Sequence, residues 1–128
     1  MTSISLAQSP WNWELQSGPQ VALEGEIMAH PFTGGLRAPQ WSPIDMDGDG
    51  DEDLFMFDRD GSRVLVFERN NSSWVERPDW SEGWPEMRHW VLLRDFDCDG
   101  LPDLFTSFQN NIHVWKNTGL NPNGPPNF

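Results

Sequence analysis

The sequence contains one cysteine, Cys98, and no tyrosine, and its 8 Lys and Arg residues face 20 Asp and Glu residues. A single cysteine excludes an internal disulfide framework. The net charge of −12 argues against nucleic acid and against anionic lipid headgroups as partners. No apolar run approaches the length that a bilayer span requires. We therefore expect no nucleic-acid binding and no membrane insertion.

Long helices and catalytic motifs are also missing. Eleven glycines and eleven prolines interrupt the chain, and no helical period is visible between them. The sequence shows no nucleophile elbow, no phosphate-binding loop and no Cys/His metal cluster. The three histidines, His30, His89 and His113, have no metal-ligand spacing. These absences predict an all-β protein that is not an enzyme.

The chain does contain one acidic loop in two copies, fifty residues apart. Residues 45–55 read DMDGDGDEDLF, and residues 95–105 read DFDCDGLPDLF. Side chains two apart fall on the same side of an extended or looping chain, and the glycine after the third Asp permits a sharp turn. Three carboxylates in each copy can therefore converge on one cation. Oxygen-only, strongly anionic ligands predict Ca²⁺ rather than zinc, copper or magnesium.

We predict two calcium sites, one in each loop. The first, third, fifth and ninth residues would supply carboxylates, and the seventh would supply its main-chain carbonyl. The predicted ligands are Asp45, Asp47, Asp49, Asp51 and Asp53 in the first loop, and Asp95, Asp97, Asp99, Leu101 and Asp103 in the second. We expect the ions to hold the fold together rather than to act as a switch. The alternative is an ordinary solvated turn. Cys98 is expected to point its small side chain away from the ion.

The residues that flank each loop predict strands. An EF-hand would carry a Glu at the twelfth position between two helices, whereas Met56 and Thr106 stand there. A short apolar run, a polar tip and a second alternating run follow each loop. These segments are 54–57, 60–62 and 64–67 in the first copy, and 104–108, 109–111 and 112–115 in the second. Each repeat is therefore predicted as strand, calcium loop, strand, turn, strand.

These loops and strands resemble the FG-GAP/VCBS repeats, which form the blades of integrin-α-type β-propellers. The resemblance covers about residues 38–119. Residues 30–36, 53–59 and 95–100 are similar, more narrowly, to the amino-terminal propeller region of large secreted Bacteroidetes surface proteins. The resemblance implies calcium in the loop between the first two strands of a blade, at the ligand positions named above. It does not imply an enzyme.

The repeat length sets the expected organisation. About fifty residues is a usual size for one blade, so the chain would hold about two to two and a half four-stranded antiparallel blades of a partial β-propeller. Closed propellers typically need at least about four blades. We therefore expect part of a longer protein, or a unit that completes the propeller by oligomerising. The predicted segments are a partial blade (1–37), the first repeat with its linker (38–86), the second repeat (87–119) and a tail (120–128).

The amino-terminal region is less regular. Residues 1–8 have the small-residue character of the end of a secretion signal, but they lack its basic start and its apolar run. A truncated signal and a plain disordered start both remain open. Residues 11–15 and 20–27 are predicted as strands of the partial blade.

Eight tryptophans are many for this length. Trp41, Trp90 and Trp115 lie in predicted strands, and we expect them in the core between blades. A second group lies in a polar, proline-broken segment, residues 74–85, that we predict to be an exposed link between repeats. Exposed indoles there would stack on sugar rings or contact a protein partner. The possible ligand-binding residues are Trp74, Trp80 and Trp84.

The predicted function is that of a calcium-binding, non-catalytic β-propeller module of an extracellular or cell-surface protein. It would serve as a scaffold or adhesion element with a protein or glycan ligand that the sequence does not identify. One alternative is a lectin-like, carbohydrate-binding module that uses the tryptophan segment. The other is an accessory region of a larger secreted enzyme whose catalytic groups lie elsewhere.

Overall fold

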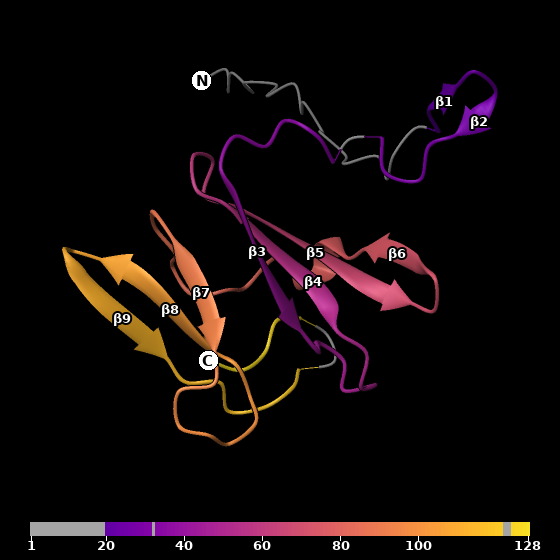
Figure 1. The fold of residues 1–128 in the computed structure, drawn as a ribbon. Coiled ribbons are helices and arrows are strands. Elements are labelled where there is room, and N and C mark those ends of the chain that lie inside the picture. Colours follow the sequence, from indigo (N-terminus) through magenta and orange to yellow (C-terminus); the bar gives the residue numbers. More distant parts are fainter. Residues whose placement is uncertain (1–19, 32, 122–123) are drawn as a thin grey trace, which may run out of the picture. The chain divides into compact units, whose positions relative to one another are not determined.

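The computed structural model describes residues 20–31, 33–121 and 124–128. The chain divides into two compact units, residues 1–33 and 34–128. The described residues form three antiparallel sheets and one short 3-10 helix (Figure 1), which confirms the all-β prediction. Within these residues, no helix has the length and apolar character needed to cross a membrane.

The described part of the first unit is a small hairpin. Strand β1 (Ala22–Leu23) pairs with β2 (Glu26–Ile27) around Glu24 and Gly25, whose φ angles are +52° and +89°. Positive φ at both central residues is typical of a two-residue hairpin turn. The prediction of one strand over residues 20–27 was therefore wrong, because this turn reverses the chain. The predictions for residues 1–8 and 11–15 lie outside the described residues.

The first sheet of the second unit has four strands in sequence order. These are β3 (Pro39–Ile44), β4 (Asp53–Asp58), β5 (Arg63–Asn70) and β6 (Ser73–Glu76). Ile44 pairs with Asp53, so the first acidic loop is the connection between β3 and β4. The strands predicted over 54–57 and 64–67 are confirmed. The segment predicted as an exposed link contributes the fourth strand instead, because residues 73–76 pair with β5.

The second sheet has three strands among the described residues. These are β7 (Val91–Arg94), β8 (Asp103–Phe108) and β9 (Asn111–Trp115), again in sequence order. Arg94 pairs with Asp103, so the second acidic loop connects β7 to β8. The turn between β8 and β9 is Gln109–Asn110, with φ angles of +49° and +66°. The predicted order of strand, loop, strand, turn, strand is confirmed in both repeats.

The main core lies between these two sheets, which contact each other through β3 and β7 (Figure 1). The first sheet contributes Phe55, Phe57 and Val66, and the second contributes Val91, Leu93 and Leu104. Trp80 joins them from the 3-10 helix η1 (Pro78–Trp80). The chain end returns to this core, where Phe128 packs against Trp84 at 5.4 Å between ring centroids.

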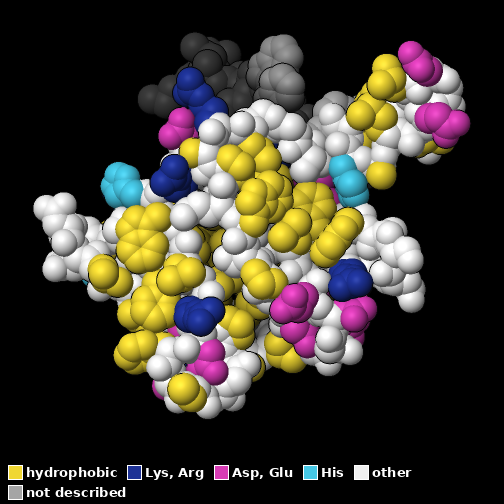
Figure 2. Space-filling model, viewed as in Figure 1, with side chains coloured by type: hydrophobic (Ala, Val, Ile, Leu, Met, Phe, Trp, Pro, Cys, Tyr) yellow, Lys and Arg dark blue, Asp and Glu magenta, His cyan; other side chains and the backbone are white. Residues whose placement is uncertain are grey.

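The outer face of the second sheet is apolar and exposed. Its exposed apolar residues are Leu92, Ile112 and Val114, and the exposed Phe96 of the adjoining loop lies 5.9 Å from Phe105 between ring centroids. By strand register, the row Leu92–Phe105–Val114 corresponds to the row Ser42–Phe55–Val66 of the first sheet. The first sheet packs onto the second with that row, whereas Leu92 and Val114 of its counterpart are exposed. Figure 2 shows hydrophobic side chains gathered over the region of β7 to β9.

Two tryptophans that we predicted in a core lie on the surface. Trp41 is 52% exposed and Trp115 is 40% exposed, so the prediction was wrong for both. Ser42 and Ile44 are on the face of β3 that lies against the second sheet. Successive side chains of a strand point to opposite faces, so Trp41 points away from the second sheet. Trp115 lies on β9, at the opposite edge of the sheet from β7. The two sheets contact each other at β7. Trp90 is half-buried and precedes β7.

Candidate metal centre

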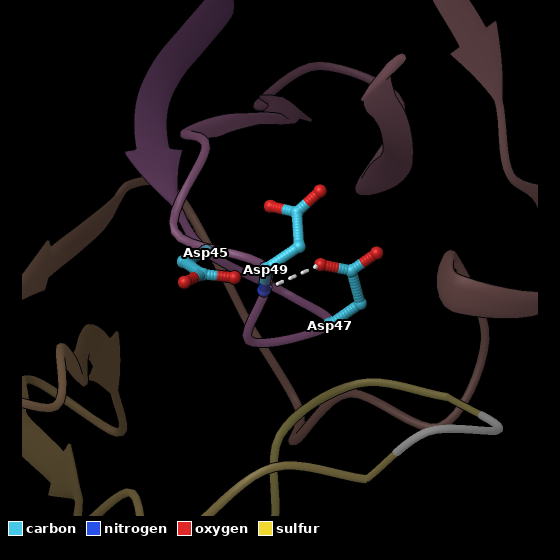
Figure 3. Close-up of side chains that lie close together, drawn as sticks. All are labelled: Asp45, Asp47 and Asp49. Carbon is cyan, nitrogen blue, oxygen red and sulfur yellow. Dashed lines mark hydrogen bonds between the residues drawn. The ribbon is translucent and has the colours of Figure 1, made fainter. Parts of the chain in front are cut away.

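The first acidic loop brings three carboxylates together. Asp45, Asp47 and Asp49 each offer an oxygen, and these oxygens lie within 4.8 Å of one another. Figure 3 shows the three side chains on the loop that follows β3. Of the five ligands predicted here, the structure thus places the first, third and fifth residues of the loop in one cluster.

Backbone N–H groups of the loop orient these carboxylates. The two oxygens of Asp45 accept hydrogen bonds from Gly48 N at 2.6 Å and Gly50 N at 3.1 Å. Asp47 accepts one from Asp49 N at 3.1 Å, drawn as a dashed line in Figure 3, and Asp49 accepts one from Asp51 N at 2.8 Å. Gly50 has a φ of +91°, a value that only glycine adopts without strain. The glycine predicted to turn the chain therefore does so.

The second loop repeats this arrangement. Asp95, Asp97 and Asp99 offer oxygens within 4.8 Å of one another. Asp95 accepts hydrogen bonds from Cys98 N at 2.7 Å and Gly100 N at 3.0 Å, and the φ of Gly100 is again +91°. A bond from Leu101 N lowers the pKa of Asp99 because it stabilises the charged carboxylate.

The ninth residue of the first loop has a different position. Asp53 is buried and accepts hydrogen bonds from Met46 N at 2.9 Å and Arg69 N at 2.8 Å. It joins the loop to β5 and is not one of the three clustered carboxylates. Burial raises the pKa of Asp53 against the lowering effect of these two donors, and the charges of Asp47 and Asp49 raise it further.

Asp103 has the same role in the second repeat. It is also buried, and it accepts hydrogen bonds from Phe96 N at 2.9 Å and Asn117 N at 2.8 Å. Both ninth-position carboxylates were predicted to close a calcium cage. The structure shows Asp53 linking the first loop to β5, and Asp103 linking the second loop to Asn117, which lies just after β9. Their role as calcium ligands remains a prediction.

The seventh residue of each loop lies outside the clusters. The carboxylate of Asp51 is exposed, and the counterpart Leu101 has none to offer. A main-chain carbonyl is the group that these two residues share. Its role as a calcium ligand remains a prediction.

Lys116 contacts the second cluster. Its ammonium Nζ donates to the carboxylate of Asp97 and lies 3.2 Å from Asp99 Oδ2. These two contacts raise the pKa of Lys116, that with Asp97 the more strongly. Sequence reasoning missed this residue. The available signal was that Lys116, the only lysine of the chain, directly follows the last strand of the second repeat.

The corresponding residue of the first repeat is Glu68. Phe67 pairs with Leu54 as Trp115 pairs with Leu104, so the next residues, Glu68 and Lys116, are equivalent. Glu68 accepts a hydrogen bond from Arg77 Nη1 at 2.6 Å. At this equivalent position, the first cluster therefore has no counterpart of the lysine contact.

Arg77 also explains why Trp80 is unavailable to a ligand. The Arg77 guanidinium binds both carboxylate oxygens of Asp79, at 3.1 and 2.7 Å, and its carbon lies 3.9 Å from the centre of the Trp80 ring. Trp80 is 2% exposed within the core. The prediction that Trp80 is an exposed ligand-binding residue was wrong, because the 3-10 helix turns it inward.

Trp84 is half-buried at the margin of the same core. Its Nε1 donates to Trp80 O at 2.8 Å, and its ring lies 4.5 Å from that of Phe55. Trp74 alone of the three is exposed, and it lies on β6 rather than in a link. The three tryptophans therefore do not form one surface.

A groove of about 620 Å³ opens beside the core, away from both acidic clusters. Its charged and titratable lining residues are Arg59, Glu86, Arg88 and His89, and its apolar ones include Phe57, Val64, Trp84 and Met87. Sequence reasoning did not find it, since β4, β5 and the segment before β7 contribute residues that are distant in the sequence.

Tandem antiparallel sheets, each with an Asp-rich loop between its first two strands, define a β-repeat protein. Residues 45–106, which span both loops, match the family model of the FG-GAP-like repeat. The chain therefore carries FG-GAP-like repeat sequence, as its loops and strands predicted. No curated protein and no solved structure matches it significantly. The narrower similarity to secreted Bacteroidetes proteins stays a prediction.

Proposed function

We propose that this chain is a calcium-binding, non-catalytic β-propeller repeat module of an extracellular or cell-surface protein. In that protein it would serve as a scaffold or adhesion element with a protein or glycan partner. One observation carries the proposal: two separate loops fold alike and each gathers three carboxylates within 4.8 Å.

The chemistry of the two clusters suits calcium. Every clustered ligand atom is a carboxylate oxygen, the donor type that hard cations prefer. Three carboxylates so close together repel one another, and a bound divalent cation offsets that repulsion. Asp45, Asp47 and Asp49 would hold one ion, and Asp95, Asp97 and Asp99 the other. The ion would supply charge neutralisation and would stiffen the connection between two strands.

The packing of the sheets supports the propeller. The first sheet covers one face of the second with its row Ser42–Phe55–Val66. The equivalent row of the second sheet, Leu92–Phe105–Val114, faces outward. A further sheet of the same design would cover that row by the same contact. Repetition of one sheet-to-sheet contact about an axis is how propellers are built.

A thermal melt with metal counting tests the proposal. The purified chain is melted in excess EDTA and again in millimolar Ca²⁺, with millimolar Mg²⁺ as the matched control. Because an ion that binds only the folded state stabilises it, we expect calcium to raise the melting temperature more than magnesium does. Elemental analysis should find about two calcium ions per chain. An unchanged melting temperature with no bound metal would show that the loops are only turns.

A further inference from the structure

The second acidic cluster contains a positive charge supplied by the chain itself. The Lys116 ammonium donates to Asp97 Oδ2 and lies 3.2 Å from Asp99 Oδ2, so it reaches two of the three clustered carboxylates. Lys116 is 19 residues from Asp97 in sequence and enters the site from the end of β9. The contact is therefore made by the tertiary fold and is not part of the loop.

The first cluster lacks such a group among the described residues. None of the ion pairs between described residues joins a Lys or Arg to Asp45, Asp47 or Asp49. The position equivalent to Lys116 carries Glu68, whose carboxylate is held by Arg77 at 2.6 Å. Two loops of one pattern thus differ by a full charge reversal at one neighbouring position.

We propose that Lys116 makes the two cation sites unequal, because the ammonium and a calcium ion compete for the same oxygens of Asp97 and Asp99. This inference rests on the proposed calcium function. The first loop binds calcium at the lower concentration. The second binds it only when Lys116 moves off the two carboxylates, which its flexible four-carbon stem and 55% exposed side chain allow.

Calorimetric titration with CaCl₂ tests the competition. We expect the wild-type chain to bind two ions with different affinities, and Lys116→Met to tighten the weaker site about tenfold, the size expected for two exposed ion pairs. Lys116→Arg keeps the charge and should keep the weak site. Arg37→Met removes an equal charge from an exposed pair with Asp60, which lies at the opposite end of the β3–β4 pair from the first loop, and should change neither site.

Two further variants assign the sites. Asp47→Asn should abolish the tighter binding, and Asp97→Asn should abolish the weaker binding. If both sites bind calcium and Lys116→Met changes neither affinity, the inference fails while the proposed function stands. If neither the wild type nor Lys116→Met binds calcium, the proposed function itself fails.

A second readout follows the lysine directly. Because Lys116 is the only lysine, amine acetylation followed by mass spectrometry reports on it, with the chain's α-amino group as the internal reference. We expect saturating Ca²⁺ to accelerate acetylation of Lys116 relative to EDTA. An equal rate in both conditions, with two ions bound, would overturn the displacement of Lys116.

Discussion

The first acidic loop follows β3 and the second follows β7, and in both the leading Asp accepts hydrogen bonds from the fourth and sixth residues of the loop. Their surroundings differ. Lys116 neutralises part of the second cluster, whereas Leu120 of the C-terminal segment lies against Gly48 of the first loop. The comparison teaches that the loop pattern determines the backbone, while residues far along the chain set the charge and packing around it.

The two buried carboxylates that anchor the acidic loops, Asp53 and Asp103, should have the largest effect on stability. Asp53→Ala and Asp103→Ala each leave two backbone N–H groups without their acceptor, so each should lower the free energy of unfolding by about 2–4 kcal/mol. Urea unfolding in EDTA measures this. The control is Asp51→Ala, whose exposed carboxylate should matter by less than about 0.5 kcal/mol. Similar losses for all three variants would contradict the anchoring role.

Removing one clustered carboxylate tests the two sites separately. Asp47→Ala and Asp97→Ala should each reduce the bound calcium from two ions to one. When the free calcium concentration is one hundred times the dissociation constant, the lost ion should lower the free energy of unfolding by about 2.7 kcal/mol. Asp51→Ala should retain both ions, since only its carbonyl would be used. Elemental analysis and melts in Ca²⁺ give the answer. Loss of an ion in Asp51→Ala would refute the carbonyl assignment.

In EDTA, where no calcium is bound, Asp47→Ala and Asp97→Ala should change the stability of the chain differently. Asp97→Ala removes a partner of Lys116 and should destabilise the chain slightly, whereas Asp47→Ala relieves repulsion without breaking an ion pair. Identical effects in EDTA would mean that the lysine does not distinguish the loops.

The fourth loop position differs between the copies. Gly48 has a φ of +81°, and a Cβ there would lie 2.6 Å from Leu120 Cδ1, whereas Cys98 adopts a φ of +63° with its side chain exposed. Gly48→Cys should cost about 1–2 kcal/mol, chiefly from left-handed strain. Cys98→Gly should change stability by less than about 1 kcal/mol, because relief of strain is offset by the entropy of glycine. Chemical unfolding of both variants measures the asymmetry, and equal costs would contradict it.

The smallest effect concerns the hairpin ends. Asp58 accepts hydrogen bonds from Ala38 N at 2.9 Å and Arg37 N at 3.3 Å. The bond from Ala38 is the main cause that lowers the pKa of Asp58 below the ordinary 3.8. The equivalent residue of the second sheet is Phe108, which has no carboxylate. A lowered carboxyl pKa contributes stability that is present above the unfolded value and is lost as pH falls below it.

Asp58→Asn should therefore be less stable than wild type at pH 7, and the difference should shrink as pH is lowered through 3.8. Urea unfolding at steps between pH 7 and pH 3 measures the gap. Asp60→Asn, an exposed neighbour, is the control. A gap that is constant with pH would exclude the charge as its source.

Much of the fold was predictable from local pattern. Alternating and apolar runs gave β4, β5, β8 and β9, since strand formation depends on residues that are close in sequence. The three-carboxylate clusters followed from the D-x-D-x-D-G spacing for the same reason. The fourth strand β6 was missed, because only Trp74 and Val75 of its four residues are apolar and the strand is defined by pairing with β5.

Residues whose role depends on distant neighbours were not predictable. Trp80 reads as an exposed indole in a polar segment, yet the 3-10 helix and Arg77 hold it in the core. Trp41 reads as core, yet it is exposed on the face of the sheet opposite to the main core. In each case the burial is set by which surfaces meet, and no local pattern encodes that.

The sequence by itself determined the all-β class, the two repeats and the turn of each acidic loop, because spacing, glycine and side-chain alternation act within a few residues. Only the tertiary structure decided that Asp53 and Asp103 anchor the loops, that Lys116 contacts one cluster and that Trp80 is buried. Those outcomes depend on hydrogen bonds, charges and packing between segments that the fold brings together from many residues apart.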